Sequence, residues 1–267
     1  MKLPIDFEQI YQKYIDSENE KNRKERYEGK ESFYKASSSG FCSRKIYFES
    51  VAKIEVTNPT EKKGQRIMRL GTVMHDDLQR ALIYNNNINN NINNKEYILN
   101  KESIVNKEKE NKNKQKEIFH IEGNVEISEL NVRGHYDAVF EGDDVYLFDF
   151  KTIANWSYSK KFGHKKDFDP TIHQELQLGT YGYAIKEEFG KLDGMYLVYY
   201  NKDNSMMNSK QIPLTYLNRA YNFWYNINEE HKKGLPDFKQ GVSPVQDWNC
   251  SYCPYLDHCN PPNRKRR

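Results

Sequence analysis

RGHYDAVFEGDDVYLFDFKT, residues 133–152, predicts two antiparallel strands joined by a tight acidic turn at Glu141-Gly142-Asp143-Asp144. Apolar and aromatic residues alternate along both arms, which is typical of strands with one buried face. Successive side chains of a strand point to opposite faces of the sheet. The pattern therefore predicts a hairpin at the centre of a sheet.

The alternation also groups the charged residues of the hairpin. On the second arm Asp149 and Lys151 share one face, and Phe148 and Phe150 share the other. On the first arm Asp137 points the same way as Arg133, His135 and Val139. If the arms pair across the turn, Asp137 approaches Asp149 and Lys151. Two carboxylates beside a lysine suit a site that binds a hard divalent cation and stabilises the charge of a phosphate.

A solvent-exposed strand face would carry the same residue types without any chemistry. The flanking residues argue against that reading, because Tyr146, Leu147, Phe148 and Phe150 predict a largely buried strand. Buried charges are costly unless they are paired or bind a metal. Asp149 and Lys151 are therefore candidates for a functional site.

Composition limits the classes of protein that fit. A chain of 267 residues suits one large domain, and its 13% of aromatic residues, 20 of them Tyr, is enough to fill a core. The formal charge of +3 is too small to indicate a nucleic-acid partner by itself. No long apolar run predicts a membrane span or a signal peptide. We expect a protein without membrane contact, located in the cytoplasm.

The N-terminal third predicts two helices. Residues 1–30 form a charged, helix-compatible arm with a partial apolar face at Ile5, Ile10, Tyr11, Tyr14 and Ile15. Residues 31–267 are expected to form the main domain. Within it, residues 64–83 predict a long amphipathic helix with a stripe of Leu70, Met74, Leu78 and Leu82. His75 lies beside this stripe, so we expect it to face inward or to line the edge of a cleft.

Residues 85–94 read NNNINNNINN and continue into a Lys/Asn/Glu-rich segment up to residue 117. Such a segment buries almost no apolar surface. We interpret residues 85–117 as a flexible low-complexity insertion.

A further group of residues mixes aromatic rings with cations after the hairpin. In sites for single-stranded nucleic acid, cationic side chains bind the phosphates and aromatic rings stack on the bases. A solvated loop is the alternative. The candidate DNA-binding residues here are Trp156, Tyr158, Lys160, Lys161, Lys165 and Lys166.

The remaining segments alternate between the two periodicities. Residues 170–189 and 214–233 predict helices, residues 195–200 predict a strand, and another strand is expected near Gln211. Gln177 and Tyr181 are four residues apart and share one face of the first of these helices. Interleaved strands and helices predict an α/β or α+β fold with a central mixed sheet flanked by helices.

The C-terminal segment carries three of the four cysteines, Cys250, Cys253 and Cys259, while Cys42 lies far away in the sequence. Structural disulfides are rare inside cells. A zinc site is one reading, in which His258 replaces a missing thiolate. An iron–sulfur cluster is the other, because it tolerates three clustered cysteines plus one distant cysteine.

In this order the motifs resemble the PD-(D/E)xK nuclease superfamily, and specifically its iron–sulfur branch of RecB-like exonucleases. That branch includes the nuclease domain of AddB and the CRISPR-associated RecB-like exonucleases. The resemblance runs from about residue 41 to residue 259. Its motifs are Cys42-x-Arg44-x-x-Tyr47, His75 in GTVMH, Asp137 in GHYD, Asp149-x-Lys151, Gln177-x-x-x-Tyr181, and the three late cysteines.

The resemblance implies a restriction-endonuclease-like fold and a role for each motif residue. His75, Asp137 and Asp149 would bind Mg²⁺ or Mn²⁺, with the Phe150 carbonyl as a further ligand. Lys151 would orient or activate the attacking water, and Gln177 and Tyr181 would shape the DNA channel. A [4Fe–4S] cluster on Cys42, Cys250, Cys253 and Cys259 would tie the ends of the chain together. The chain departs from the superfamily pattern at Tyr136, where a proline is common.

From these motifs we expect a metal-dependent DNA nuclease, most plausibly an exonuclease on single strands or DNA ends, in recombination, repair or replication. No P-loop motif is present, so unwinding would need a helicase or recombination partner. Arg44 and the basic-aromatic segment would contact DNA. The Asn/Lys/Ile-rich composition suggests an AT-rich genome, such as that of a virus. Three alternatives stay open: a nuclease that trims new CRISPR spacers, a non-catalytic DNA-end-binding module with a structural or redox-sensing cluster, and a zinc protein.

Overall fold

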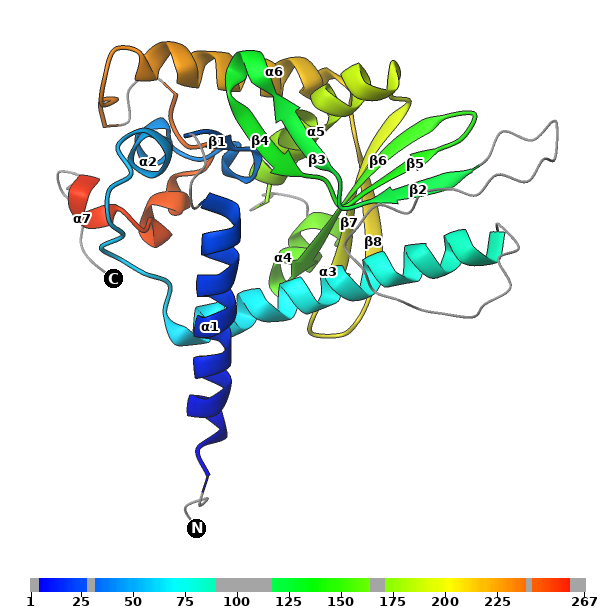
Figure 1. The fold of residues 1–267 in the computed structure, drawn as a ribbon, viewed down its shortest axis with the longest axis horizontal. Helices are drawn as coiled ribbons and strands as arrows, with labels where there is room; N and C mark the ends of the chain where they lie inside the picture. Colours follow the sequence, from blue (N-terminus) through cyan, green and yellow to red (C-terminus); the bar gives the residue numbers. More distant parts are fainter. Residues whose placement is uncertain (1–4, 28–31, 90–116, 164–170, 239–241, 260–267) are drawn as a thin grey trace.

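The computed structural model describes residues 5–27, 32–89, 117–163, 171–238 and 242–259. Five helices longer than a single turn flank the strands within these ranges (Figure 1). They are α1 (Phe7–Tyr27), α3 (Lys62–Asn89), α4 (Asn155–Phe162), α5 (His173–Phe189) and α6 (Thr215–His231). Short helical turns occupy the segments that carry the cysteines: α2 (Ser43–Ile46), η2 (Tyr47–Val51), η4 (Asp247–Tyr252) and α7 (Leu256–Cys259).

The strands form two sheets. The larger sheet has the order β2-β5-β6-β7-β8, in which β6 and β7 are parallel and the other neighbours antiparallel. The smaller sheet has the order β1-β4-β3. The bounds are β1 (Tyr34–Lys35), β2 (Ile118–Ile121), β3 (Asn124–Ile127), β4 (Val132–His135), β5 (Ala138–Glu141), β6 (Val145–Ile153), β7 (Gly194–Asn201) and β8 (Met207–Ile212). The predicted fold class, a mixed sheet flanked by helices, is confirmed.

The predicted hairpin is correct in its second half and wrong in its first. Strands β5 and β6 pair across the acidic turn, with Glu141 opposite Val145. The first arm is not one strand, because β4 leaves the large sheet and pairs with β3 and β1 instead. Asp137 therefore lies in the break between the two sheets and not within a strand, so its alignment with Arg133, His135 and Val139 along one arm is corrected.

Strand β6 is the buried centre of the large sheet. Val145 and Leu147 are almost inaccessible, and Asp149 on the same face is only 2% exposed. Helix α5 packs on this face and α6 packs on α5, where Gly179 permits the close approach: a Cβ atom there would lie 2.5 Å from the Tyr216 carbonyl oxygen. The β-branched and aromatic residues of β6 and β7 thus form a core strand pair, as their sequence predicted.

Helix α3 is longer than the predicted helix and takes in the start of the expected insertion. Its last residues, Asn85–Asn89, are helical, so the insertion does not begin at residue 85. The Asn86 side-chain amide accepts from the backbone N–H of Phe119 at 3.0 Å and donates to its carbonyl at 2.9 Å. These two bonds satisfy the backbone at the edge strand β2 and attach the helix end to the sheet. Residues 90–116 lie outside the described residues.

The apolar faces predicted for the two N-terminal helices are only partly buried. On α1, Ile15 is 1% exposed, whereas Ile10, Tyr11 and Tyr14 are exposed. On α3, Leu70 is also exposed, while Met74, Leu78 and Leu82 are half-buried. Helix α1 contacts α3 through polar groups, including a 2.7 Å hydrogen bond from Gln12 to Gln65. These helices lie at the periphery of the molecule (Figure 1).

The C-terminal segment of the described chain packs against residues 40–58. The backbone N–H groups of Thr57 and Asn58 both donate to the Pro254 carbonyl, at 3.1 and 3.0 Å. Ser43 donates its N–H to Val242, and Val245 donates to Gly40. The segment from residue 242 to residue 259 is thus bound to residues 40–58 by main-chain contacts.

Candidate active site

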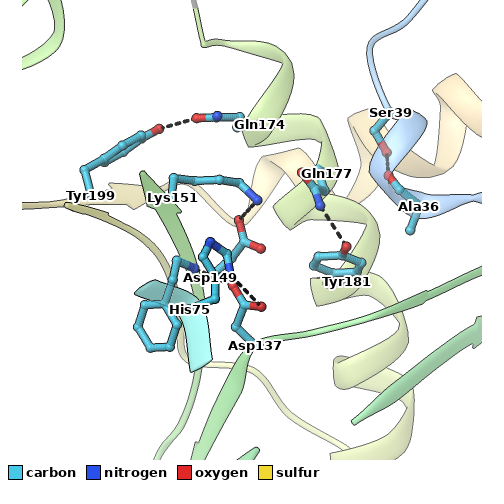
Figure 2. Close-up of polar contacts among 11 residues, drawn as sticks. Ala36, Ser39, His75, Asp137, Asp149, Lys151, Gln174, Gln177, Tyr181 and Tyr199 are labelled. Atoms are coloured by element: carbon cyan, nitrogen blue, oxygen red, sulfur yellow. Dashed lines mark hydrogen bonds and ion pairs between the residues drawn. The ribbon is translucent and has the colours of Figure 1, made fainter. Parts of the chain in front are cut away.

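Four charged or titratable side chains meet where α3, the β4–β5 break and β6 come together (Figure 2). His75 Nδ1 lies 3.5 Å from Asp137 Oδ1, and Lys151 Nζ lies 2.7 Å from Asp149 Oδ2. The Phe150 backbone N–H donates to Asp137 Oδ2 at 2.6 Å, which joins the two pairs. The spatial arrangement expected from the sequence is present: the four residues surround one place.

The four residues come from three parts of the fold. Asp149 and Lys151 alternate with Phe150 on β6 and therefore face α5. His75 comes from the side of α3 that packs on β6, where Gly71 permits close contact, since a Cβ atom there would lie 3.0 Å from Thr152 Oγ1. The His75 ring also meets the Phe150 ring edge-on at 6.3 Å.

The two carboxylates have opposite pKa shifts. Burial raises the pKa of Asp149 to about 6, and Asp137 adds to the rise, while the Lys151 charge opposes it. Burial also acts to raise the pKa of Asp137, but the hydrogen bond from His75 and the charge of Lys151 outweigh it, so this pKa is lowered. Two neighbouring acids whose pKa values differ in this way are typical of sites that manage protons or cations.

The donor set fits a divalent cation chemically. Asp149 Oδ2 is buried, and among the described residues its charged partner is the Lys151 ammonium at 2.7 Å. Carboxylate oxygens and an imidazole are ligands for Mg²⁺ and Mn²⁺. As the side chains stand, no three His, Cys, Asp or Glu residues within the described ranges form a ready-made metal site. Here Lys151 supplies a positive charge beside the two acids.

Helix α5 lines the same place with glutamines. Gln177 Nε2 donates to the Tyr181 hydroxyl at 2.8 Å, so the predicted i,i+4 pair is formed. Gln174, one turn earlier, accepts a hydrogen bond from the Tyr199 hydroxyl at 3.0 Å. Sequence reasoning gave Gln174 and Tyr199 no role. The available signals were the spacing of three residues between Gln174 and Gln177 and the position of Tyr199 on the apolar strand MYLVYY.

The first part of the predicted DNA-binding segment, residues 155–162, forms helix α4. In α4, Trp156 is 61% exposed and Lys160 is half-buried. Tyr158 and Lys161 are buried, because α4 packs against β7 and places Lys161 Nζ 4.7 Å from the centre of the Tyr199 ring. The expectation that these two side chains lie on a DNA-facing surface is therefore corrected. Lys165 and Lys166 lie outside the described residues.

The four cysteines line one cavity, although Cys42 is far from the others in sequence. All four are free thiols and half-buried. Burial raises the pKa of the Cys42, Cys253 and Cys259 thiols. Arg44 and Lys45 line the same cavity, and their charges oppose the rise at Cys259 and Cys253 respectively.

Arg44 lines this cavity and is half-buried. Its Nε atom is buried and has no hydrogen-bond partner among the described residues, and its guanidinium lies 5.7 Å from the centre of the Phe48 ring. The DNA contact predicted for Arg44 stays a prediction.

A family model described as the PD-(D/E)XK nuclease superfamily matches residues 32–260. This chain belongs to the PD-(D/E)XK nuclease superfamily. The match includes all four residues of the site, so the mixed sheet is the restriction-endonuclease-like core of this nuclease. No curated protein matches the sequence significantly.

Three solved structures are similar to this chain to different degrees. A crystal structure of SSO0001 is similar with a TM-score of 0.53 and 17% identity, covering 94% of this chain and 96% of that one. An alkaline exonuclease, LHK-Exo from Laribacter hongkongensis, has a TM-score of 0.42 and 13% identity, covering 75% of this chain and 88% of its own. LHK-Exo in complex with dAMP has a TM-score of 0.36 and 14% identity, covering 75% and 92%. In the part of the nuclease that the structure describes, no helix has the length and apolar character to cross a membrane.

Proposed function

We propose that this nuclease hydrolyses phosphodiester bonds in DNA with Mg²⁺ or Mn²⁺ as cofactor, and that it acts as an exonuclease on DNA ends or single strands. The proposal rests on one observation: four side chains, His75, Asp137, Asp149 and Lys151, lie at one place. His75 is 3.5 Å from Asp137, and Lys151 is 2.7 Å from Asp149. Membership of the superfamily supports the nuclease, and the RecB-like resemblance of the motifs supports the exonuclease.

His75, Asp137 and Asp149 would hold the cation, with the Phe150 carbonyl as the proposed further ligand. A bound divalent cation polarises an attacking water and shields the phosphate charge. The burial of Asp149 supports this assignment, because a buried carboxylate is costly without positive partners, and a bound cation would join Lys151 in that role.

Lys151 has a role of its own. Its side chain is 15% exposed and stays beside Asp149, so its ammonium is preorganised next to the scissile phosphate. A fixed positive group stabilises the charge that builds up on the phosphate oxygens during in-line attack. Lys151 also donates hydrogen bonds that orient the attacking water. Gln177 would border the DNA channel, and the buried Tyr181, whose hydroxyl accepts the hydrogen bond from Gln177 Nε2, would hold that side chain in place.

The four cysteines would hold a [4Fe–4S] cluster, which places the nuclease in the iron–sulfur RecB-like branch. Their cavity supports this by its donor set of four thiols beside two cationic residues, Arg44 and Lys45. A cluster held by four thiolates is anionic, and neighbouring cations lower the free-energy cost of burying it. Zinc is the competing occupant. Iron and acid-labile sulfide in anaerobically purified protein favour the cluster, and stoichiometric zinc excludes it.

We further propose that Trp156, Lys160, Lys165 and Lys166 contact the DNA strand, and that the nuclease works in the cytoplasm, together with a helicase or recombination partner. The exposed Trp156 ring offers a stacking surface to an unpaired base. Replication, repair and recombination are the proposed settings.

The test compares wild-type protein with Asp149→Ala on end-labelled single-stranded and double-stranded DNA, with Mg²⁺ or Mn²⁺. We expect wild type to release nucleotides or short fragments from an end, and the variant to be inactive while it still binds DNA. If wild type binds DNA ends and cuts nothing with either metal, the protein is a binding module and the proposed function is wrong. Circular DNA distinguishes an exonuclease from an endonuclease, because an exonuclease needs an end and leaves circular DNA intact.

A further inference from the structure

Tyr199 occupies a special position beside the active site. It lies on β7 in register with Lys151 on β6, and register partners of adjacent strands point to the same face of the sheet. Helix α5 covers this face. The tyrosine is therefore a direct neighbour of the lysine proposed to act on the phosphate, and it lies under the helix that carries the glutamines.

The Tyr199 ring is held on several sides. The side chain is completely buried, Phe162 meets it edge-on at 5.5 Å, and Lys161 Nζ lies 4.7 Å from the ring centre. A buried hydroxyl that donates no hydrogen bond costs free energy. The Tyr199 hydroxyl donates to Gln174 Oε1 at 3.0 Å. The position of the Gln174 oxygen is thus set by a rigid partner.

A fixed oxygen also fixes the other end of the amide. Oε1 and Nε2 of a glutamine point in opposite directions, and Nε2 carries two hydrogen-bond donors. Gln174 is half-buried, and Figure 2 shows it with Gln177 on the side of α5 that faces Lys151 and Asp149. Among the described residues, no hydrogen bond uses Gln174 Nε2. The amide nitrogen is thus an oriented donor at the edge of the site.

We propose that Gln174 binds the DNA backbone, donating from Nε2 to a non-bridging oxygen of the phosphate next to the one that is cut. Tyr199 is the positioning residue that orients the amide. A phosphate is the fitting ligand because its oxygens only accept hydrogen bonds, and contacts from amide side chains to phosphates fix the register of a strand without reading its sequence. The inference rests on the proposed DNA substrate and adds a contact outside the cation and lysine positions.

Binding and turnover separate this role from a structural one. Gln174→Glu keeps the size and an oxygen for Tyr199 but replaces the donor with an anion. We expect the dissociation constant for labelled single-stranded DNA, measured in Ca²⁺, to rise about tenfold or more, and KM to rise with it, while kcat at saturating DNA changes less than about twofold. Tyr199→Phe should weaken binding about threefold. Tyr200→Phe, whose exposed hydroxyl bonds Ser205, is the matched control and should bind like wild type.

A double-mutant cycle tests the orientation itself. In Gln174→Lys the ammonium offers donors in all directions and needs no orienting partner. Adding Tyr199→Phe to Gln174→Lys should therefore leave the affinity unchanged, although the same substitution weakens wild type. Equal losses in both backgrounds would show that Tyr199 acts only through stability, and the positioning role would be wrong.

The outcomes also separate this inference from the proposed function. The phosphate contact is wrong if Gln174→Glu binds DNA as tightly as wild type, whether or not its kcat falls. This conclusion holds even if Asp149→Ala confirms the nuclease. Wild type that binds DNA without cutting it overturns the proposed function, and the affinity comparison then still decides the contact. Thermal melting of each variant shows that the compared proteins are folded.

Discussion

Lys151 is the residue whose contribution to the reaction is simplest to isolate. Lys151→Ala removes the ammonium beside Asp149 and leaves the cation ligands in place. Loss of one preorganised group that stabilises developing charge lowers kcat by about 10²–10³. We expect cleavage to fall by that factor, with DNA binding and the melting temperature close to wild type.

Single-turnover cleavage of labelled DNA measures the effect of Lys151→Ala. Lys232→Ala is the control, since Lys232 pairs with Glu229 on the exposed end of α6. Cleavage by Lys151→Ala at the wild-type rate would remove the lysine from the mechanism.

His231 gives the fold a predictable dependence on pH. It is buried, its Nδ1 lies 2.9 Å from the Tyr34 hydroxyl, and its Nε2 lies 3.0 Å from the Ser43 carbonyl. Burial lowers its pKa from the ordinary value of 6.5, so the folded protein keeps it neutral. As the pH falls, His231 binds a proton more readily in the unfolded chain than in the folded protein. Its contribution to stability is therefore complete above pH 6.5 and is lost as the pH falls toward the lowered pKa.

Urea unfolding at several pH values from 7.5 downward measures this dependence, comparing wild type with His231→Gln. The variant lacks the titrating group, so the stability of wild type should fall more steeply below pH 6.5 than that of the variant. Parallel curves for the two proteins would show that His231 does not titrate on unfolding.

At the level of single residues, sequence reasoning found the acids, the lysine and the histidine because a strand has a simple period. Asp149 and Lys151 had to share a face, and His75 had to lie near the apolar stripe of its helix. It could not find the Gln174–Tyr199 pair, because that contact joins a helix and a strand 25 residues apart and has no periodic signature. For the same reason it misplaced Tyr158 and Lys161, whose burial depends on tertiary packing.

Among the elements, α3 offers the clearest test. Its C-terminal turn is attached to β2 by the two hydrogen bonds of the Asn86 amide to Phe119. Asn86→Ala removes both bonds and exposes the edge of the large sheet. Partly buried bonds of this kind contribute about 1 kcal/mol each, so we expect a loss of about 1–2 kcal/mol in the free energy of unfolding.

Chemical denaturation of Asn86→Ala measures this loss, with Asn85→Ala as the control. Asn85 is exposed and adjacent in sequence, so its replacement should change stability by less than about 0.5 kcal/mol. Equal stability of the two variants would mean that the helix end is not attached through Asn86.

The elements also show where the sequence pattern reached its limit. The turn of the β5–β6 hairpin and the buried character of β6 followed from alternation and turn residues. The break at Tyr136-Asp137 did not, because alternation continues through it and only the pairing of β4 with β3 reveals that the chain changes sheets. The low-complexity asparagines hid the end of α3, since composition there favours a loop and the tertiary contacts of Asn86 stabilise the helix.

For the molecule as a whole, a cluster in the cysteine cavity is predicted to link residues 40–58 to residues 242–259. Cys253→Ala removes one proposed cluster ligand, and a [4Fe–4S] cluster with three thiolates is labile. We expect loss of the visible absorption and of bound iron, together with a lower melting temperature, because the contacts between residues 40–58 and 242–259 then lack their covalent link.

Iron analysis, visible spectra and thermal melting of anaerobically purified protein check the Cys253→Ala prediction. Ser251→Ala, a polar-to-apolar change two residues before Cys253, is the control and should keep the iron. A variant with an unchanged spectrum would exclude Cys253 as a ligand.

The position of Asp137 between two sheets has a mechanical consequence. One acid of the pair belongs to the junction with the three-stranded layer, whereas the other is fixed in the five-stranded layer. A small displacement of one sheet relative to the other changes the distance between the carboxylate oxygens of Asp137 and Asp149. It does so without unfolding either sheet. Substitutions in the core under the three-stranded sheet, away from the substrate, should therefore lower the cleavage rate at temperatures where the protein is still folded.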